Sequence, residues 1–156
     1  MRDSQVVPPI MVCVFLLMVS LLPGCGGSDV SEGPSLADVK GKVLFGNEPL
    51  ASADLTFFPT GTTEGIGGTV RTDESGAFQG VIYARGGEGL PAGTYKVAVS
   101  KRVMPDGSPV PPNDETPAIE SPAQETMPPR YLSPEWSPLE VVVEDGKPLE
   151  LVLKKT

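Results

Sequence analysis

Short alternating segments separated by turn residues set the tightest limit on how this chain can fold. Tyr95, Val97 and Val99 alternate with smaller or polar side chains over residues 94–100, so they share one face of a strand. The same alternation occurs over residues 39–45 and 53–57, and residues 69–72, 77–82, 139–143 and 149–153 also have the composition of short strands. No helical periodicity longer than one turn competes with it. The sequence therefore predicts an all-β fold, a seven-stranded β-sandwich.

One turn motif predicts a β-hairpin. The Asp73 side chain is suited to capping a tight turn, and Gly76 accepts the positive φ that the chain reversal requires. Segments 69–72 and 77–82 are therefore expected to pair with each other. Asp73 and Glu74 are also candidate calcium ligands, but two carboxylates supply too few oxygens for an ion with about six to eight ligands, which favours the structural turn.

A second turn motif predicts a terminal hairpin. Asp145-Gly146 provides the corner between segments 139–143 and 149–153. Earlier in the chain, residues 60–68 are rich in glycine and threonine and are expected to form a mobile loop.

An apolar run near the start of the chain is expected to be removed. The run 10–22 has about 13 residues, whereas a membrane-spanning helix needs roughly 20. It ends at Leu22-Pro23-Gly24-Cys25, which resembles the bacterial lipobox. The resemblance implies a lipoprotein signal peptide at 1–24, cleavage before Cys25 and attachment of lipid to its thiol. The alternative is an ordinary secretory signal in which Cys25 is incidental.

The mature chain is then expected to be tethered to a membrane of the cell envelope. Two or more acyl chains on Cys25 anchor a protein stably, whereas one chain binds only marginally. Residues 26–29 and 31–35 lack the apolar side chains that a core needs, so 25–36 is expected to be a flexible tether. The sequence leaves open whether the membrane is the inner or the outer one.

Composition excludes most catalytic chemistry. The chain has no histidine and two cysteines, Cys13 within the signal segment and Cys25 at the lipidation site. Ser-His-Asp and Cys-His catalytic groups and thiolate metal sites are therefore excluded. An enzyme would depend on carboxylates such as Asp54 or Glu64, and because no motif points to one we expect no catalytic activity, cofactor or metal. The formal charge of −8 argues against nucleic acid as a partner.

A proline-rich insert is the most unusual region of the chain. Residues 102–129 contain eight prolines among small and acidic residues, namely Pro105, Pro109, Pro111, Pro112, Pro117, Pro122, Pro128 and Pro129. This composition predicts extended, partly polyproline chain that is neither a helix nor a paired strand. The insert is either a solvated connection between two strands or a docking segment for a partner.

Two aromatic residues and one arginine after the insert are possible binding residues. Tyr131 and Trp136 lie among prolines, where they could stack on a sugar ring or anchor a protein contact. Arg130 could extend either site through hydrogen bonds or a stacked guanidinium. The alternative is that these side chains fold back over the open edge of the sandwich.

Four motifs, taken in order, resemble the carboxypeptidase regulatory-like family. They are Val39-Lys40-Gly41-Lys42-Val43, Pro49-Leu50, Thr72-Asp73-Glu74-Ser75-Gly76-Ala77-Phe78 and Pro91-Ala92-Gly93-Thr94-Tyr95-Lys96-Val97. The resemblance implies a transthyretin-like, or prealbumin-like, β-sandwich over residues 37–156. With the lipobox, and with Pro129-Arg130-Tyr131-Leu132-Ser133-Pro134 and Ser137-Pro138-Leu139, the chain is similar to small envelope lipoproteins of planctomycete bacteria.

This resemblance implies a fold rather than a reaction, because such domains serve as accessory, adhesive or carbohydrate-contacting modules. Hydroxyisourate hydrolases and intradiol dioxygenases have similar folds but depend on histidines that this chain lacks. We therefore expect a non-catalytic protein-interaction or structural module that uses a strand edge or the proline-rich insert. The alternative is a polysaccharide-binding module that uses Tyr131 and Trp136.

Overall fold

The computed structural model describes residues 33–112, 114, 116–117 and 119–155. The expected signal peptide 1–24 and the expected lipidation site Cys25 lie outside this part of the chain, as does most of the expected tether. Within it there is no α-helix, so the all-β prediction is confirmed for these residues. None of its segments forms a helix of the length and hydropathy needed to span a bilayer.

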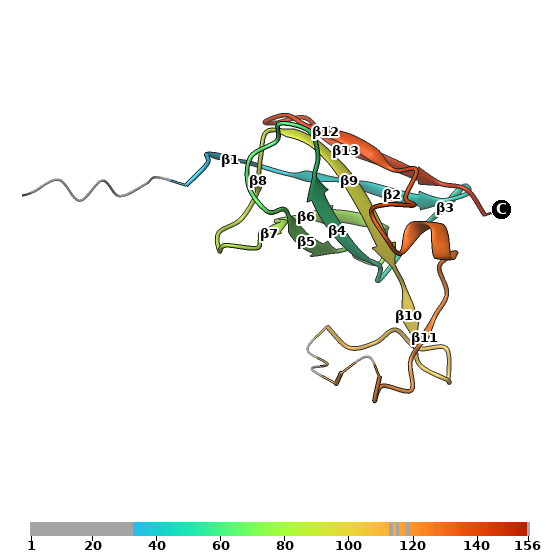
Figure 1. Ribbon diagram of the computed structural model, residues 1–156. Helices are drawn as coiled ribbons and strands as arrows, with labels where there is room; N and C mark the ends of the chain where they lie inside the picture. Colours follow the sequence, from blue (N-terminus) through green and yellow to red (C-terminus); the bar gives the residue numbers. More distant parts are fainter. Residues whose placement is uncertain (1–32, 113, 115, 118, 156) are drawn as a thin grey trace, which may run out of the picture. The chain divides into compact units, whose positions relative to one another are not determined.

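The larger of two main sheets is built around the segment that alternates most clearly in the sequence (Figure 1). Its strand order is β12 (Glu140–Val143), β9 (Gly93–Ser100), β4 (Asp54–Pro59), β5 (Gly68–Arg71) and β7 (Ile82–Tyr83). All neighbours in this sheet are antiparallel. Tyr95, Val97 and Val99 of β9 are fully buried, which confirms that they share the core-facing side of a strand.

The second main sheet contains β13 (Leu149–Leu153), β2 (Lys40–Phe45), β3 (Glu48–Pro49) and β6 (Ala77–Gln79). Strands β13 and β2 run parallel, whereas β3 and β6 pair with β2 in the antiparallel direction. The edge strands are therefore β12 and β7 in the larger sheet, and β13 forms one edge of the smaller sheet.

One hydrophobic core lies between the two sheets. Phe57 of the larger sheet contacts Phe78 of the smaller one, with ring centroids 6.1 Å apart, and Tyr95 meets Phe57 edge-on at 6.3 Å. The Tyr95 hydroxyl donates a hydrogen bond to the Pro91 carbonyl at 2.7 Å, so its buried polar end is satisfied. Two sheets that share one core are consistent with a β-sandwich.

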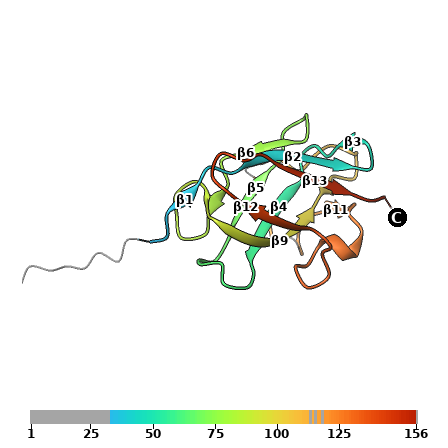
Figure 2. The same ribbon diagram turned by 90° about the horizontal axis from the view of Figure 1, so that it is seen from above.

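Both predicted hairpins are wrong. Strands β12 and β13 belong to different sheets, and so do β5 and β6, so each turn carries the chain across the core (Figures 1 and 2). The expected strand 77–82 is also divided, since Gly80 has a φ of 69° and β6 and β7 lie in different sheets. The turn residues specify a reversal of the chain, but the inward-facing side chains decide which strands pair.

The predicted turn chemistry around Asp73 is nevertheless present. The Asp73 carboxylate accepts hydrogen bonds from the Ser75 hydroxyl at 2.7 Å and from the Ser75 and Ala77 backbone N–H groups at 2.8 and 3.0 Å. The Ser75 hydroxyl bond, followed by the backbone bonds, lowers the pKa of Asp73. Gly76 has a φ of 73°, as the reversal requires.

Two short strand pairs lie outside the main sheets. Strand β1 (Leu36–Ala37) pairs with β8 (Leu90–Pro91), so Leu36 takes part in the fold although it falls at the end of the expected tether. Strand β10 (Arg102–Val103) pairs with β11 (Gln124–Glu125), and the 3-10 helix η1 (Pro129–Tyr131) follows. The prediction that the insert forms no paired strand is therefore wrong at both of its ends.

Candidate functional site

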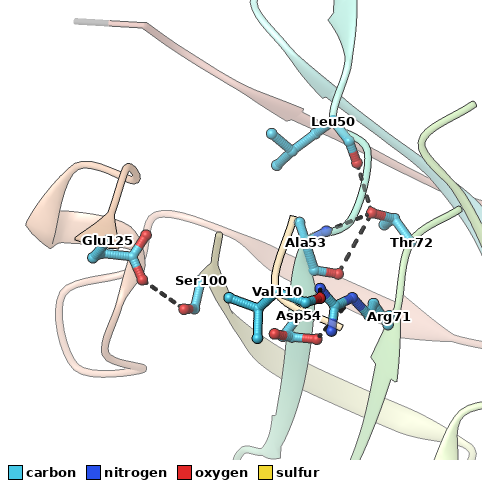
Figure 3. Close-up of polar contacts among 8 residues, drawn as sticks. All are labelled: Leu50, Ala53, Asp54, Arg71, Thr72, Ser100, Val110 and Glu125. Atoms are coloured by element: carbon cyan, nitrogen blue, oxygen red, sulfur yellow. Dashed lines mark hydrogen bonds and ion pairs between the residues drawn. The ribbon is translucent and has the colours of Figure 1, made fainter. Parts of the chain in front are cut away.

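The proline-rich insert is held at its base by one carboxylate. Glu125 of β11 accepts hydrogen bonds from the Ser100 hydroxyl at 2.5 Å (Figure 3) and from the backbone N–H of Lys101 at 3.0 Å. It also accepts the backbone N–H groups of Thr126 at 2.9 Å and Met127 at 2.7 Å. The bonds from Ser100 and Lys101 fix the point at which the chain leaves the sheet. The buried Met127 side chain fixes the point at which it returns to the core.

A second anchor joins the insert to the outer face of the larger sheet. Arg71 of β5 donates a hydrogen bond from Nη2 to the Val110 carbonyl at 2.6 Å, and its Nε lies 3.8 Å from the Asp54 carboxylate (Figure 3). Asp54 and Arg71 are cross-strand partners, so the sheet register sets this contact. Burial raises the pKa of Asp54, and the positive charges of Arg71 and Arg102 oppose that shift.

Thr72 fixes the start of β4 beside this anchor. Its buried hydroxyl donates to the Leu50 carbonyl at 2.6 Å and accepts the Ala53 backbone N–H at 2.9 Å (Figure 3). These bonds satisfy backbone groups that would otherwise be unpaired in the core. The strand that carries Asp54 therefore has a defined beginning.

A polar cavity of about 220 Å³ lies between the insert and the sheet. It is lined by Asp54, Arg71, Arg102, Val110, Pro111, Pro112, Asp114 and Thr116. The lining includes two guanidinium groups and two carboxylates, so its charges compensate one another, while the Arg71 bond to the Val110 carbonyl joins the insert to the sheet. Further along the insert, the Ile119 side chain is 94% exposed. The insert is thus anchored near its base and presents a large apolar side chain farther out.

Tyr131 lies in the core and its ring is not accessible to a ligand. The residue is 2% exposed, its hydroxyl accepts the Lys154 backbone N–H at 2.9 Å, and it donates to the Lys154 carbonyl at 3.3 Å. Arg130 donates from Nη2 to the same carbonyl at 2.8 Å, and its guanidinium lies 4.9 Å from the centre of the Tyr131 ring. Both residues therefore attach the segment after the insert to the end of β13.

Trp136, by contrast, lies at the surface on a well-anchored turn. Its side chain is 73% exposed. The Ser133 carbonyl accepts the backbone N–H groups of Trp136 at 3.3 Å and of Ser137 at 2.9 Å, which closes the turn. Ser137 is buried, and its hydroxyl donates to the Val97 carbonyl at 2.5 Å and accepts the Leu139 backbone N–H at 3.2 Å. The sheet thus fixes the backbone that presents the indole.

Near this turn is a polar depression that sequence reasoning missed, which we call the threonine hollow. It has a volume of about 380 Å³ and is lined by Thr60, Gly61, Thr62, Thr63, Ala92, Gly93, Thr94 and Glu140. The Thr94 carbonyl accepts the Thr60 and Thr63 hydroxyls, each at 3.1 Å, which holds the loop in place. The only sequence signal for the hollow was the threonine content of residues 60–68. That composition predicted a mobile loop, and the mobility stays a prediction.

The two carboxylates considered for catalysis do not come together. Asp54 begins β4, whereas Glu64 follows the other end of that strand in an exposed loop. A strand of six residues separates its ends by about 17 Å, which is too far for joint acid–base work. Among the described residues there is also no group of three or more Cys, Asp or Glu side chains placed to hold a metal ion.

Comparison of the chain with protein-family models, with curated proteins and with solved structures found no match. The chemistry of the insert, of Trp136 and of the threonine hollow is therefore the ground for proposing a function.

Proposed function

We propose that this protein is a lipid-anchored module of the bacterial cell envelope that holds another envelope protein and has no catalytic activity of its own. The lipobox-like motif before Cys25 supports the anchor, and the absence of histidine supports a non-catalytic role. We further propose that the sandwich is transthyretin-like and of the carboxypeptidase regulatory-like type. The order of its sequence motifs supports this assignment, as does the arrangement of strands in two sheets around one core.

The observation that carries this proposal is the anchored insert. Its base is fixed by Glu125 and Arg71, while Ile119 is 94% exposed farther along. Ile119 lies in a turn in which the Pro117 carbonyl accepts the Glu120 and Ser121 backbone N–H groups at 2.9 and 3.0 Å. A proline-rich segment held in this way loses little conformational freedom on binding, so it serves well for recognition. An exposed isoleucine on such a segment supplies the apolar anchor that protein contacts require.

A deletion that keeps the base of the insert tests this function. Residues 105–122 are replaced by Asn-Gly, which suits a tight turn between β10 and β11 and leaves Glu125 in place. Wild type, this deletion and Ile119→Ser are compared by crosslinking in intact cells followed by mass spectrometry. We expect one dominant partner with the wild type, weaker recovery with Ile119→Ser and none with the deletion. Recovery of the same proteins by all three versions would overturn the proposal.

The lipid anchor has a separate test. Cys25→Ser removes the thiol that would carry the lipid, so we expect the variant to be absent from the detergent-extracted lipoprotein fraction. Mass spectrometry of the wild-type N-terminal peptide should show cleavage before Cys25 and added acyl chains. An unmodified Cys25 in the mature protein would support the ordinary secretory signal instead.

Polysaccharide binding is the second candidate function, and the exposure of Trp136 favours it. A planar indole that is 73% exposed is suited to stacking on the apolar face of a sugar ring. Tyr131 and Arg130, which the sequence grouped with Trp136, contact Lys154 instead. A polysaccharide site would therefore need polar groups from elsewhere in the fold.

A further inference from the structure

We propose that Trp136 and the threonine hollow form one binding surface for a neutral oligosaccharide, which we call the glycan strip. The inference rests on the second proposed function, polysaccharide binding, and assigns its site and ligand class. The strip consists of the threonine hollow, the Glu140 and Lys96 side chains and the Trp136 indole. The sequence pattern predicted neither the hollow nor these two charged residues as parts of a binding site.

Direct contacts connect the hollow to the turn that carries Trp136. Glu140 lines the hollow, and its carboxylate lies 3.5 Å from the Lys96 ammonium group. Lys96 donates a hydrogen bond from Nζ to the Ser137 carbonyl at 3.4 Å, and Ser137 directly follows Trp136. The register of β12 against β9 places Glu140 opposite Lys96, so the sheet itself aligns these groups. Lys96 and Glu140 therefore link the hollow to the backbone of the turn that presents the exposed indole.

The polar groups of the strip suit the hydroxyl groups of a sugar. The Glu140 and Lys96 side chains are 55% and 31% exposed, so the carboxylate can accept hydrogen bonds and the ammonium can donate them. Among the described residues, no side chain or backbone group bonds to the Thr62 hydroxyl in the hollow, and this exposed group can act as donor or acceptor. The Trp136 ring supplies the apolar platform for stacking.

Charge and length narrow the class of ligand. The Lys96 and Glu140 charges compensate each other, and the chain as a whole has a formal charge of −8. An acidic polysaccharide would be repelled by that net charge, which favours a neutral one. Because the Lys96 side chain lies between Glu140 at the rim of the hollow and the Trp136 turn, the strip extends beyond the hollow and matches an oligosaccharide better than a single sugar.

The site is already formed before a ligand binds. Bonds from Thr60 and Thr63 to the Thr94 carbonyl hold the hollow, and the buried Ser137 holds the turn that carries Trp136. A site whose backbone is fixed in advance loses less conformational entropy on binding, which increases affinity.

Affinity electrophoresis of the full-length protein in detergent tests the strip. The gels contain hydroxyethylcellulose, galactomannan or a soluble β-glucan as neutral probes and alginate as the acidic probe. We expect retardation by at least one neutral polysaccharide and none by alginate. Trp136→Ala and Glu140→Gln should each weaken the retardation about tenfold, the effect of losing one stacking contact or one charged hydrogen-bond acceptor.

Ile82→Ala is the matched control. Ile82 is 58% exposed on β7, at the opposite edge of the same sheet from β12, so this variant removes exposed apolar surface outside the strip. Its retardation should stay within about twofold of the wild type, because single surface substitutions have small effects. Thermal unfolding of each variant shows that a loss of binding is not a loss of fold.

Different failures overturn different claims. If a neutral polysaccharide retards the wild type, Trp136→Ala and Glu140→Gln equally, the strip is wrong although polysaccharide binding stands. If no neutral polysaccharide retards the wild type, the function on which the strip rests fails with it. Preferential retardation by alginate would overturn the ligand class, and a Trp136-dependent crosslink to a protein without any retardation would assign this surface to a protein partner.

Discussion

The regions around Tyr131 and Trp136 have similar sequences and opposite environments. Both aromatic residues lie among prolines within one short segment, yet Tyr131 is 2% exposed and Trp136 is 73% exposed. The difference comes from the backbone that each ring meets. Tyr131 reaches both backbone groups of Lys154, at the end of β13, whereas Trp136 lies on a turn whose buried member is its neighbour Ser137. Tyr131 therefore serves stability, while Trp136 is available for contact with a ligand.

Tyr131→Ala should have the largest effect of any change in this segment. It removes a fully packed ring and both hydrogen bonds to Lys154, so we expect a loss of about 3–5 kcal/mol in the free energy of unfolding. Urea unfolding followed by circular dichroism measures this loss. A loss below about 1 kcal/mol would mean that the ring contributes little to the core.

Ser137→Ala should have an intermediate effect. The substitution removes the donor to the Val97 carbonyl and the acceptor for the Leu139 backbone N–H in a buried position. Leaving such groups unpaired costs about 1–3 kcal/mol. The same urea titration measures the cost, and Ser133→Ala, which removes only an exposed hydrogen bond to the Glu135 carboxylate in the same turn, is the matched control. Equal effects of the two substitutions would contradict the role given to Ser137.

Tyr131→Phe separates the hydroxyl of Tyr131 from its ring. Phenylalanine keeps the packing but loses the bonds to Lys154, so we expect a loss of about 0.5–1.5 kcal/mol in the free energy of unfolding. If this variant is as unstable as Tyr131→Ala, the hydroxyl rather than the ring fixes the segment after the insert.

Trp136→Ala should have the smallest effect on stability, within about 0.5 kcal/mol, because the ring is mostly exposed. Trp136 is the single tryptophan of the chain, so fluorescence reports on it alone. The folded protein should emit as a solvent-exposed indole, and acrylamide should quench it almost as well as in urea. Blue-shifted, protected emission in the folded protein would show that the ring is covered.

Sequence reasoning succeeded where local pattern and tertiary structure agree. The alternation of Tyr95, Val97 and Val99 identified the interior strand β9, because its core-facing side chains follow the two-residue period of a strand. It failed for β13, which pairs in parallel with β2 from the other end of the chain. A turn sequence such as Asp145-Gly146 does not specify the partner of the strand that follows it.

The candidate site was found in part for the same reason. Trp136 could be selected from the sequence as a proline-flanked aromatic. That Tyr131 is buried while Trp136 is exposed depends on the contact of Tyr131 with Lys154, which no local pattern encodes. Lys96 and Glu140 are more than 40 residues apart in the sequence, and only the register of β9 against β12 brings them together. The hydrogen bond from the Lys101 backbone N–H to the Glu125 carboxylate likewise depends on the pairing of β10 with β11, which are separated in sequence by the insert.

Site-specific photocrosslinking in intact cells tests the central claim of an envelope interaction module most directly. A photoreactive amino acid is placed at position 119 in the insert or at position 152, where Val152 is 52% exposed on β13. We predict that position 119 gives one dominant crosslinked envelope protein and that position 152 does not give it. The same products from both positions, or none from position 119, would contradict the proposal that the insert is the docking element.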